Sequence, residues 1–162
     1  MVEIGWTIQD LVVDIPLVSG LFEVYIRAAT DGGAFNYIQL DVFVCGLEQL
    51  TPAYSTTPEV TFIKSISGMT YSFLDSLDYF NYDNSGPNTH QDCVISEYYL
   101  FNLDGTTFTD TSIAEVSGSV LNIHTVNPLP PMQLVWQAKT NGLVATDTTL
   151  DIAVCGYEEV SV

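Results

Sequence analysis

Three cysteines are the residues in this 162-residue sequence with the clearest chemistry. Cys45, Cys93 and Cys155 could form disulfides, and a disulfide would indicate an oxidising compartment. Their number is odd, so one thiol is left without a partner inside the chain. How they pair depends on the elements that carry them.

Side-chain oxygens are dense in the connection from residue 75 to residue 92 and could bind Ca²⁺. The candidate ligands are Asp75, Asp78, Asp83 and Asp92. Their spacing is not that of an EF-hand, and the Asp-Asn-Ser-Gly-Pro segment within the connection is ordinary turn chemistry. Calcium is therefore kept as an alternative, and no cofactor is expected.

The two histidines, His90 and His124, have no nucleophile, zinc or phosphate-binding motif near them. Paired carboxylates for glycoside hydrolysis cannot be told apart from the many surface acids. We therefore expect no enzymatic activity. Net charge −17 argues against a nucleic-acid partner, and no apolar run is long enough for membrane insertion.

The segments that carry two of the cysteines are repeats of each other. Residues 40–48 read Leu-Asp-Val-Phe-Val-Cys-Gly-Leu-Glu, and residues 150–158 read Leu-Asp-Ile-Ala-Val-Cys-Gly-Tyr-Glu, an offset of 110 positions. Upstream, three alternating apolar residues also match at this offset: Phe22, Val24 and Ile26 fall on Met132, Leu134 and Trp136. The period predicts a complete repeat over 53–162 and the second half of a preceding repeat over 1–52.

Period-2 alternation and abundant Val, Ile, Thr, Tyr and Phe predict an all-β fold. The expected strands of the full repeat are 59–65, 69–74, 94–101, 106–109, 118–125, 132–139 and 147–155. Those of the half repeat are 4–8, 11–15, 21–28 and 37–45. Seven short strands in about 100 residues are typical of an immunoglobulin-like β-sandwich. The chain is thus expected to contain one half-domain and one full domain.

Repeats that end in Val-Cys-Gly-x-Glu, with an earlier cysteine before a tyrosine-rich strand, resemble a known family. They are similar to the tandem immunoglobulin-like or cadherin-like repeats of very large surface proteins of ciliated protists. In this chain the motif begins at Val44 and again at Val154, and Cys93 precedes the tyrosine-rich strand. The resemblance implies an extracellular or cell-surface location and brings no catalytic residues.

Half of a sandwich cannot bury its inner face against itself, so the half-domain needs a partner. The expected assembly face is Trp6, Phe22, Val24, Ile26, Leu40, Val42 and Val44. Another copy could supply the missing strands, as in the strand complementation of pilus-like fibres. Alternatively, upstream residues of a longer polypeptide complete the domain. Both interpretations predict an end-to-end chain of β-sandwiches. Our hypothesis is that this acidic, structural protein forms linear or helical fibrils, with itself as partner.

The repeat narrows the disulfides to two choices, Cys45 with Cys93 across a junction or Cys93 with Cys155 inside a repeat. In the immunoglobulin-like strand order, Cys93 opens the third strand near the end where the chain enters the domain. Cys155 ends the last strand at the opposite end. Bridged Cα atoms must lie within about 7 Å, which favours Cys45 with Cys93. Cys155 would then bond a neighbouring repeat or subunit.

The alternative function is an adhesin module on a stalk of such repeats, binding calcium or glycans. Aromatic side chains that could stack on sugars are Tyr79, Phe80, Tyr82, Tyr98, Tyr99 and Phe101. Aromatic strand faces in sandwiches are, however, more often core or subunit contacts.

Overall fold

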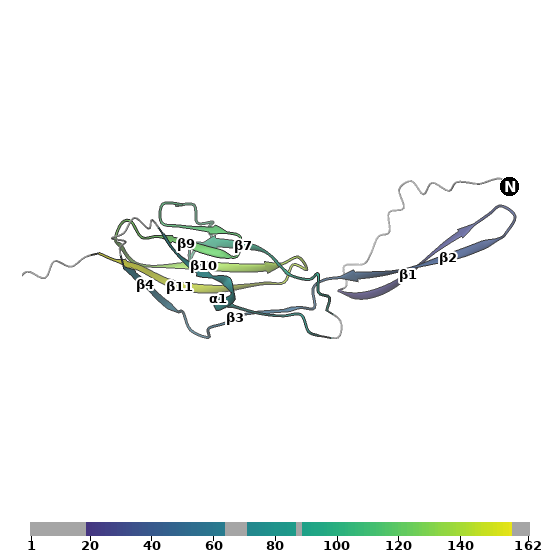
Figure 1. Cartoon of the computed structure of the whole chain (residues 1–162), viewed down its shortest axis with the longest axis horizontal. Coiled ribbons are helices and arrows are strands. Elements are labelled where there is room, and N and C mark those ends of the chain that lie inside the picture. Colours follow the sequence, from purple (N-terminus) through teal and green to yellow (C-terminus); the bar gives the residue numbers. More distant parts are fainter. Residues whose placement is uncertain (1–18, 64–70, 87–88, 157–162) are drawn as a thin grey trace, which may run out of the picture.

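The fold is described from a computed structural model, which covers residues 19–63, 71–86 and 89–156 (Figure 1). These residues form strands and a single helical turn, so the all-β prediction is confirmed. In the N-terminal part of the chain the elements are β1 (Gly20–Ala29), β2 (Phe35–Val44), β3 (Gln49–Pro52), β4 (Glu59–Ile63), β5 (Tyr71–Asp75), α1 (Ser76–Tyr79) and β6 (Phe80–Asp83). The rest are β7 (Ile95–Phe101), β8 (Ala114–Ser117), β9 (Val120–His124), β10 (Leu129–Thr140) and β11 (Ala145–Cys155).

Two sheets enclose the hydrophobic core and make a β-sandwich. One has the strand order β4-β11-β10-β7 and the other the order β5-β9-β8. β4 runs parallel to β11, and every other pair in these two sheets is antiparallel. Alternate residues of β10 and β11 point inward, which is why Trp136 and Leu150 are buried together with Leu121 of β9.

β3 pairs with β6 in a small separate sheet. Residues 49–52 are therefore attached to the sandwich through this pairing. From the repeat period, they were expected to belong to the preceding half repeat, which ends at residue 52. The connection from 75 to 92, expected to be a loop, contains α1 and β6. Asp75 is the N-cap of α1, because its carboxylate accepts a hydrogen bond from the Leu77 amide at 3.0 Å.

One expected strand of the full repeat, over 106–109, was wrong. In place of a strand over 106–109, Thr107 makes one isolated bridge with Phe101. The Asp104 carboxylate accepts bonds from both the amide and the hydroxyl of Thr106, and such local bonds compete with strand pairing. The expected strand over 118–125 corresponds to β9, which pairs with β8 in a tight hairpin that turns at Gly118, where φ is +59°.

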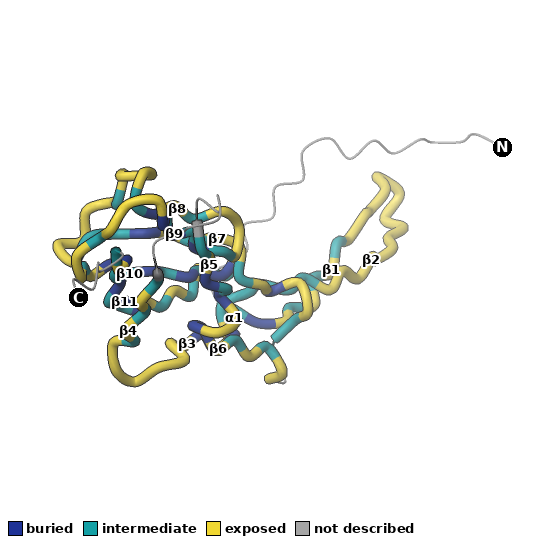
Figure 2. The backbone as a smooth tube through the Cα atoms, turned by 60° about the vertical axis from the view of Figure 1, so that its left-hand side comes forward, coloured by how far each residue is buried: buried dark blue, intermediate teal, exposed yellow. Residues whose placement is uncertain are grey.

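β1 and β2 form a long antiparallel hairpin, called here the N-terminal hairpin, which projects from one end of the sandwich (Figure 1). Most of its length is exposed, in contrast to the interior of the sandwich (Figure 2). It corresponds to the expected strands 21–28 and 37–45. The expected strands 4–8 and 11–15 lie outside the described residues.

The N-terminal hairpin has the same register as the C-terminal hairpin formed by β10 and β11. Val24 lies opposite Leu40, and 110 positions later Leu134 lies opposite Leu150. Pairing registers are specified by which residues face the core. The repeat found in the sequence is therefore also a structural repeat.

The tips of the two hairpins share their hydrogen bonds as well. The Thr30 amide donates to the Ala34 carbonyl at 2.8 Å, and the Thr140 amide donates to the Val144 carbonyl at 2.8 Å. These are equivalent residues at the offset of 110. From Phe22 and Met132 to the tips, the two hairpins thus share their local structure and differ in their surroundings; nearer the base, β10 has a register shift between Leu129 and Met132 that β1 lacks.

Candidate functional site

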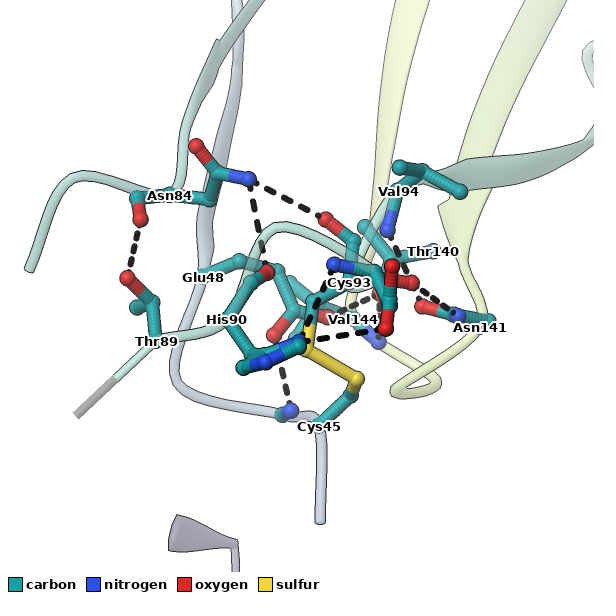
Figure 3. Close-up of a disulfide and its surroundings, with 12 residues drawn as sticks. Cys45, Glu48, Asn84, Thr89, His90, Cys93, Val94, Thr140, Asn141 and Val144 are labelled. Atoms are coloured by element: carbon teal, nitrogen blue, oxygen red, sulfur yellow. Dashed lines mark hydrogen bonds and ion pairs between the residues drawn. A yellow bond between two sulfur atoms is a disulfide. The ribbon is translucent and has the colours of Figure 1, made fainter. Parts of the chain in front are cut away.

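The N-terminal hairpin meets the sandwich at a disulfide. Cys45, directly after β2, is bonded to Cys93, shortly before β7, with a Cα–Cα distance of 5.5 Å (Figure 3). This is the pairing that the distance argument favoured. Cys155 is a free, exposed thiol, so the alternative of Cys93 with Cys155 does not form. We call residues 45–48 the connector and its contacts with the sandwich the junction.

Hydrogen bonds to its backbone hold Cys93 in a fixed position. It is fully buried, and its amide donates to the His90 carbonyl at 2.9 Å. Its carbonyl accepts a hydrogen bond from the Tyr82 hydroxyl. The side-chain amide of Asn84 reaches the carbonyls of both His90 and Cys93 at 3.5 Å (Figure 3). β6 and the following loop therefore position the sulfur that bonds the connector.

Asn141, at the tip of the C-terminal hairpin, ties that tip to the segment around Cys93. Its Oδ1 accepts from the Val94 amide at 3.1 Å, and its Nδ2 donates to the Asp92 carbonyl at 2.7 Å. Its own amide donates to the Val94 carbonyl at 3.1 Å. Three bonds from one residue join the two parts of the sandwich that receive the connector.

Glu48 is a buried carboxylate at the centre of the junction, with 4% of its surface exposed. Its Oε1 accepts from the Thr140 hydroxyl at 2.5 Å, and its Oε2 accepts from the Gly46 amide at 2.7 Å. Burial acts to raise the pKa of Glu48, but the bonds from Thr140 and from backbone amides outweigh burial and lower the pKa overall. The ionised side chain thus joins the connector to β10.

Two glycines allow the connector to approach the sandwich closely. A Cβ on Gly142 would lie 2.4 Å from the Gly46 nitrogen and 2.7 Å from the Cys45 carbonyl carbon. Gly46 has φ +133°, and a Cβ there would lie 2.2 Å from the Ser19 hydroxyl. Both positions exclude side chains, so the junction is a close backbone contact in addition to a covalent bond.

The expected assembly face lies on one side of the N-terminal hairpin and is incompletely covered. Leu40 is 42% exposed, whereas its equivalent Leu150 is fully buried. Ile38 is 56% exposed, whereas its equivalent Thr148 is 4% exposed. The half-buried members of the face are Phe22, Val24, Ile26, Val42 and Val44. Trp6 lies outside the described residues.

The four candidate calcium ligands have separate local roles. Asp75 caps α1, and exposed Asp78 belongs to that helix. Asp83 accepts from the Ser85 amide at 2.8 Å, and Asp92 lies 3.4 Å from His90 Nδ1. Within the described residues, no three His, Cys, Asp or Glu side chains come together as metal ligands. The structure does not assemble the site that the sequence suggested.

The aromatic residues considered for sugar stacking mostly face inward. Tyr79, Phe80 and Tyr98 pack against Trp136 with ring-centroid distances of 5.7, 5.3 and 6.1 Å. Tyr82 binds the Cys93 carbonyl at the junction. The remaining two, Tyr99 and half-buried Phe101, contact each other on the outer side of β7.

Four residues of the junction were not among the predicted site residues: Glu48, Thr140, Asn141 and Gly142. Glu48 could have been identified from the sequence, because it is the last residue of the repeated Cys-Gly-x-Glu motif. Asn141 and Gly142 were recognised only as a turn. Nothing in the sequence indicated that Thr140 would bind a carboxylate 92 positions away.

The fold and the junction define a disulfide-stapled β-sandwich with a projecting hairpin. Comparison with protein-family models, curated proteins and solved structures finds no match to this chain. Among the described residues, no helix is long and apolar enough to cross a membrane. The inference of function therefore rests on the junction and the two hairpins.

Proposed function

We propose that this chain is a structural subunit of an extracellular or cell-surface filament. Its β-sandwich units would join end to end by β-strand complementation and by junction disulfides. The observation that carries the proposal is the N-terminal hairpin, which repeats the register and tip of the C-terminal hairpin yet leaves incompletely covered the face that the C-terminal hairpin buries.

The C-terminal hairpin indicates what the N-terminal hairpin lacks. In the sandwich, β10 and β11 each pair with a further strand on the side away from the other: β7 pairs with β10, and β4 pairs with β11. The sheet β5-β9-β8 covers the inner face. Equivalent strands from a neighbouring unit would complete the N-terminal hairpin in the same way. An isolated two-stranded hairpin is marginally stable in water, so completion would also stabilise it.

The strand order supports an immunoglobulin-like unit. With β5, β7, β8, β9, β10 and β11 lettered B to G, the two sheets contain B-E-D and C-F-G, as in that architecture. In such a sandwich the first and last strands lead to opposite ends. This arrangement favours a linear array of units over a compact cluster.

The junction supports a structural role for the chain. A disulfide, a buried carboxylate and a close backbone contact hold the connector on the sandwich, so the hairpin is not attached through a flexible linker. The disulfide also favours an oxidising, extracellular location. These features suit a chain whose units must keep a fixed orientation.

Assembly of the full chain tests this proposal. Light scattering at rising protein concentration and negative-stain microscopy should show linear or helical fibres. Leu40→Asp, on the inner face of the hairpin, should abolish them, because a buried unpaired carboxylate is costly. Leu21→Asp makes the same chemical change on the opposite face and should leave fibres intact. A monodisperse monomer at every concentration would refute the proposal, and equal effects of the two variants would refute the role of the inner face.

A further inference from the structure

The outer face of the N-terminal hairpin is made by the odd-numbered residues of β1 and β2, which lie opposite one another in the strand register. Contacts run along this face, where the Tyr25 hydroxyl donates to Glu23 at 3.1 Å. The large apolar or aromatic side chains that are more than half exposed on it are Leu21, Tyr25, Phe35 and Tyr37. Figure 2 shows the same exposure along the projecting part of the hairpin. The hairpin thus presents apolar surface on its outer face as well as on its inner face.

The C-terminal hairpin shows what this outer face looks like on a complete sandwich. At the offset of 110, the aromatic residues at 25, 35 and 37 correspond to Val135, Ala145 and Asp147. Gln137 of that face donates to Asp147 at 2.7 Å. Small or polar residues are typical of the solvated face of an antiparallel sheet. The hairpin structure therefore does not require aromatic residues here, and their exposure indicates a surface that another molecule covers.

The charges on the outer face are unevenly placed. Glu23 lies directly opposite Asp41, and two like charges in such a pair are destabilising. Arg27 lies nearer the tip of the same face, where it stacks on the Phe35 ring at 4.5 Å and forms no ion pair with a described residue. The face thus has two opposed acids toward its base and one cation toward its tip.

We propose that the outer face docks on the outer face of a second copy of this chain, about a two-fold axis that passes beside Tyr25 and Gln39. In this arrangement β1 of one copy lies over β1 of the other and runs in the opposite direction. Tyr25 meets Tyr25 of the second copy, and Arg27 meets Glu23 and Asp41 of the second copy. The inference goes beyond the proposed filament, because strand complementation uses the inner face and the strand edges.

Charge complementarity selects this arrangement over the parallel one. If the two hairpins ran in the same direction, β1 would lie over β2 of the second copy and Glu23 would meet Asp41, so that four acids would gather at one place. Another surface of the second copy would also have to offer a cation to these acids. The chain has only two further cations, Lys64 and Lys139, and Lys139 already pairs with Glu97 at 3.2 Å.

Two chains of net charge −17 repel each other, so the contact depends on salt. At physiological ionic strength the screening length is about 8 Å, which preserves attraction between charges that touch and weakens repulsion between the rest. The pair should therefore form at physiological salt and dissociate in low salt. Because a two-fold contact uses the same surface on both copies, it closes at two and adds no third copy.

Sedimentation velocity of the full chain at physiological salt tests the pair. Leu40→Asp, which should block fibres through the inner face, should still form a dimer, because Leu40 lies on the opposite side of the hairpin. Adding Tyr25→Val and Tyr37→Asp to that chain should leave a monomer. These two substitutions place on the outer face the residues that the C-terminal hairpin has, so they suit the same local structure. A dimer that survives them would refute docking through the outer face.

A charge exchange in the Leu40→Asp chain tests the antiparallel direction. Arg27→Glu should weaken the dimer by at least about tenfold, since two sets of like charges then meet across the contact. Glu23→Arg alone should also weaken it, although this change makes the chain less negative and would strengthen unspecific association. The two changes together keep the native net charge and should restore the dimer. Failure of the exchange to restore it would refute the antiparallel contact.

Other outcomes separate this inference from the proposed filament. Fibres of the native chain, together with a Leu40→Asp chain that is monomeric at every concentration, would refute the pair and leave the filament standing. A Leu40→Asp dimer without fibres of the native chain would support the pair and count against the filament. A monomer that binds a glycan array through Tyr25 and Tyr37 would refute the pair and assign the outer face to a sugar.

Discussion

Glu48 is the residue on which the polar part of the junction depends. Its carboxylate bridges the Gly46 amide and the Thr140 hydroxyl, and Thr140 Oγ1 in turn accepts from the Val144 amide at 3.1 Å. Loss of the charge would leave donors facing a weaker acceptor in a buried place. Hydrogen bonds to a buried charged group are among the stronger ones in proteins.

Glu48→Gln should destabilise the chain by about 1–3 kcal/mol at pH 7. The substitution replaces one accepting carboxylate oxygen by an NH2 group, which is a donor and would face either the Gly46 amide or the Thr140 hydroxyl. The pKa of Glu48 is lowered in the folded state from its usual 4.5. Its contribution is therefore complete above that value and is lost as the pH falls through the lower folded pKa. Urea unfolding of both proteins between pH 7 and pH 3 checks this.

The informative quantity is the difference in unfolding free energy between the native chain and Glu48→Gln. It should shrink as the pH falls below about 4.5, because Glu48 of the unfolded native chain takes up a proton there, and it should level off once the pH is below the lower folded pKa and both folded proteins carry a neutral side chain at position 48. Comparing the two proteins removes the effect of the other acids, which titrate in both. A difference that is constant across this range would show that Glu48 is not ionised in the fold.

Gly142 and Gly32 occupy equivalent tips and make a matched pair. A Cβ on Gly142 would meet the connector backbone at 2.4 Å, whereas a Cβ on Gly32 would meet only the Thr30 hydroxyl, at 3.8 Å. Gly142→Ala should therefore cost about 1–3 kcal/mol, as overpacking usually does, and should speed reduction of the disulfide by dithiothreitol. Gly32→Ala should change neither. Similar behaviour of the two variants would argue against a close contact at the junction.

At the scale of elements, equivalent residues of the two hairpins show how much stability depends on burial, because they share a strand register and differ in exposure. Leu150→Ala should cost about 2–5 kcal/mol, the usual range for a buried leucine. Leu40→Ala in dilute monomer should cost less than about 1 kcal/mol, because the side chain is already partly exposed. Denaturant unfolding at low concentration measures both. Equal costs would mean that the inner face of the N-terminal hairpin is already covered in the monomer.

The long hairpins could be predicted because period-2 alternation and an internal repeat both indicated them. β6 and β8 were not predicted, since Phe-Asn-Tyr-Asp and Ala-Glu-Val-Ser are short and half polar. The false strand over 106–109 came from threonine, whose strand preference gave way to local bonds with Asp104. Short segments are decided by tertiary pairing, which composition does not reveal.

The disulfide could be placed by combining the repeat with the expected strand order. The rest of the junction could not, because it depends on contacts between distant parts of the chain. Thr140 and Glu48 are 92 positions apart, and Asn141 and Asp92 are 49 positions apart. Each residue type is common in turns, so only the fold identifies its partner.

The whole molecule is elongated, with the N-terminal hairpin at one end of the sandwich and Cys155 toward the other (Figure 1). This geometry suits head-to-tail contacts, which give open chains unless the rotation between units closes a ring. The high negative charge opposes side-by-side association of such chains. The account therefore predicts thin fibres and no lateral bundles at low salt.

Amide hydrogen exchange of β1 and β2 tests most directly whether another segment completes the N-terminal hairpin. The native chain is compared by mass spectrometry at dilute, monomeric concentration and in assembled material. We predict that amides on the outer edges of both strands become protected on assembly, because pairing with new strands gives them acceptors. Assembled material in which these amides exchange as fast as in the monomer would contradict strand complementation.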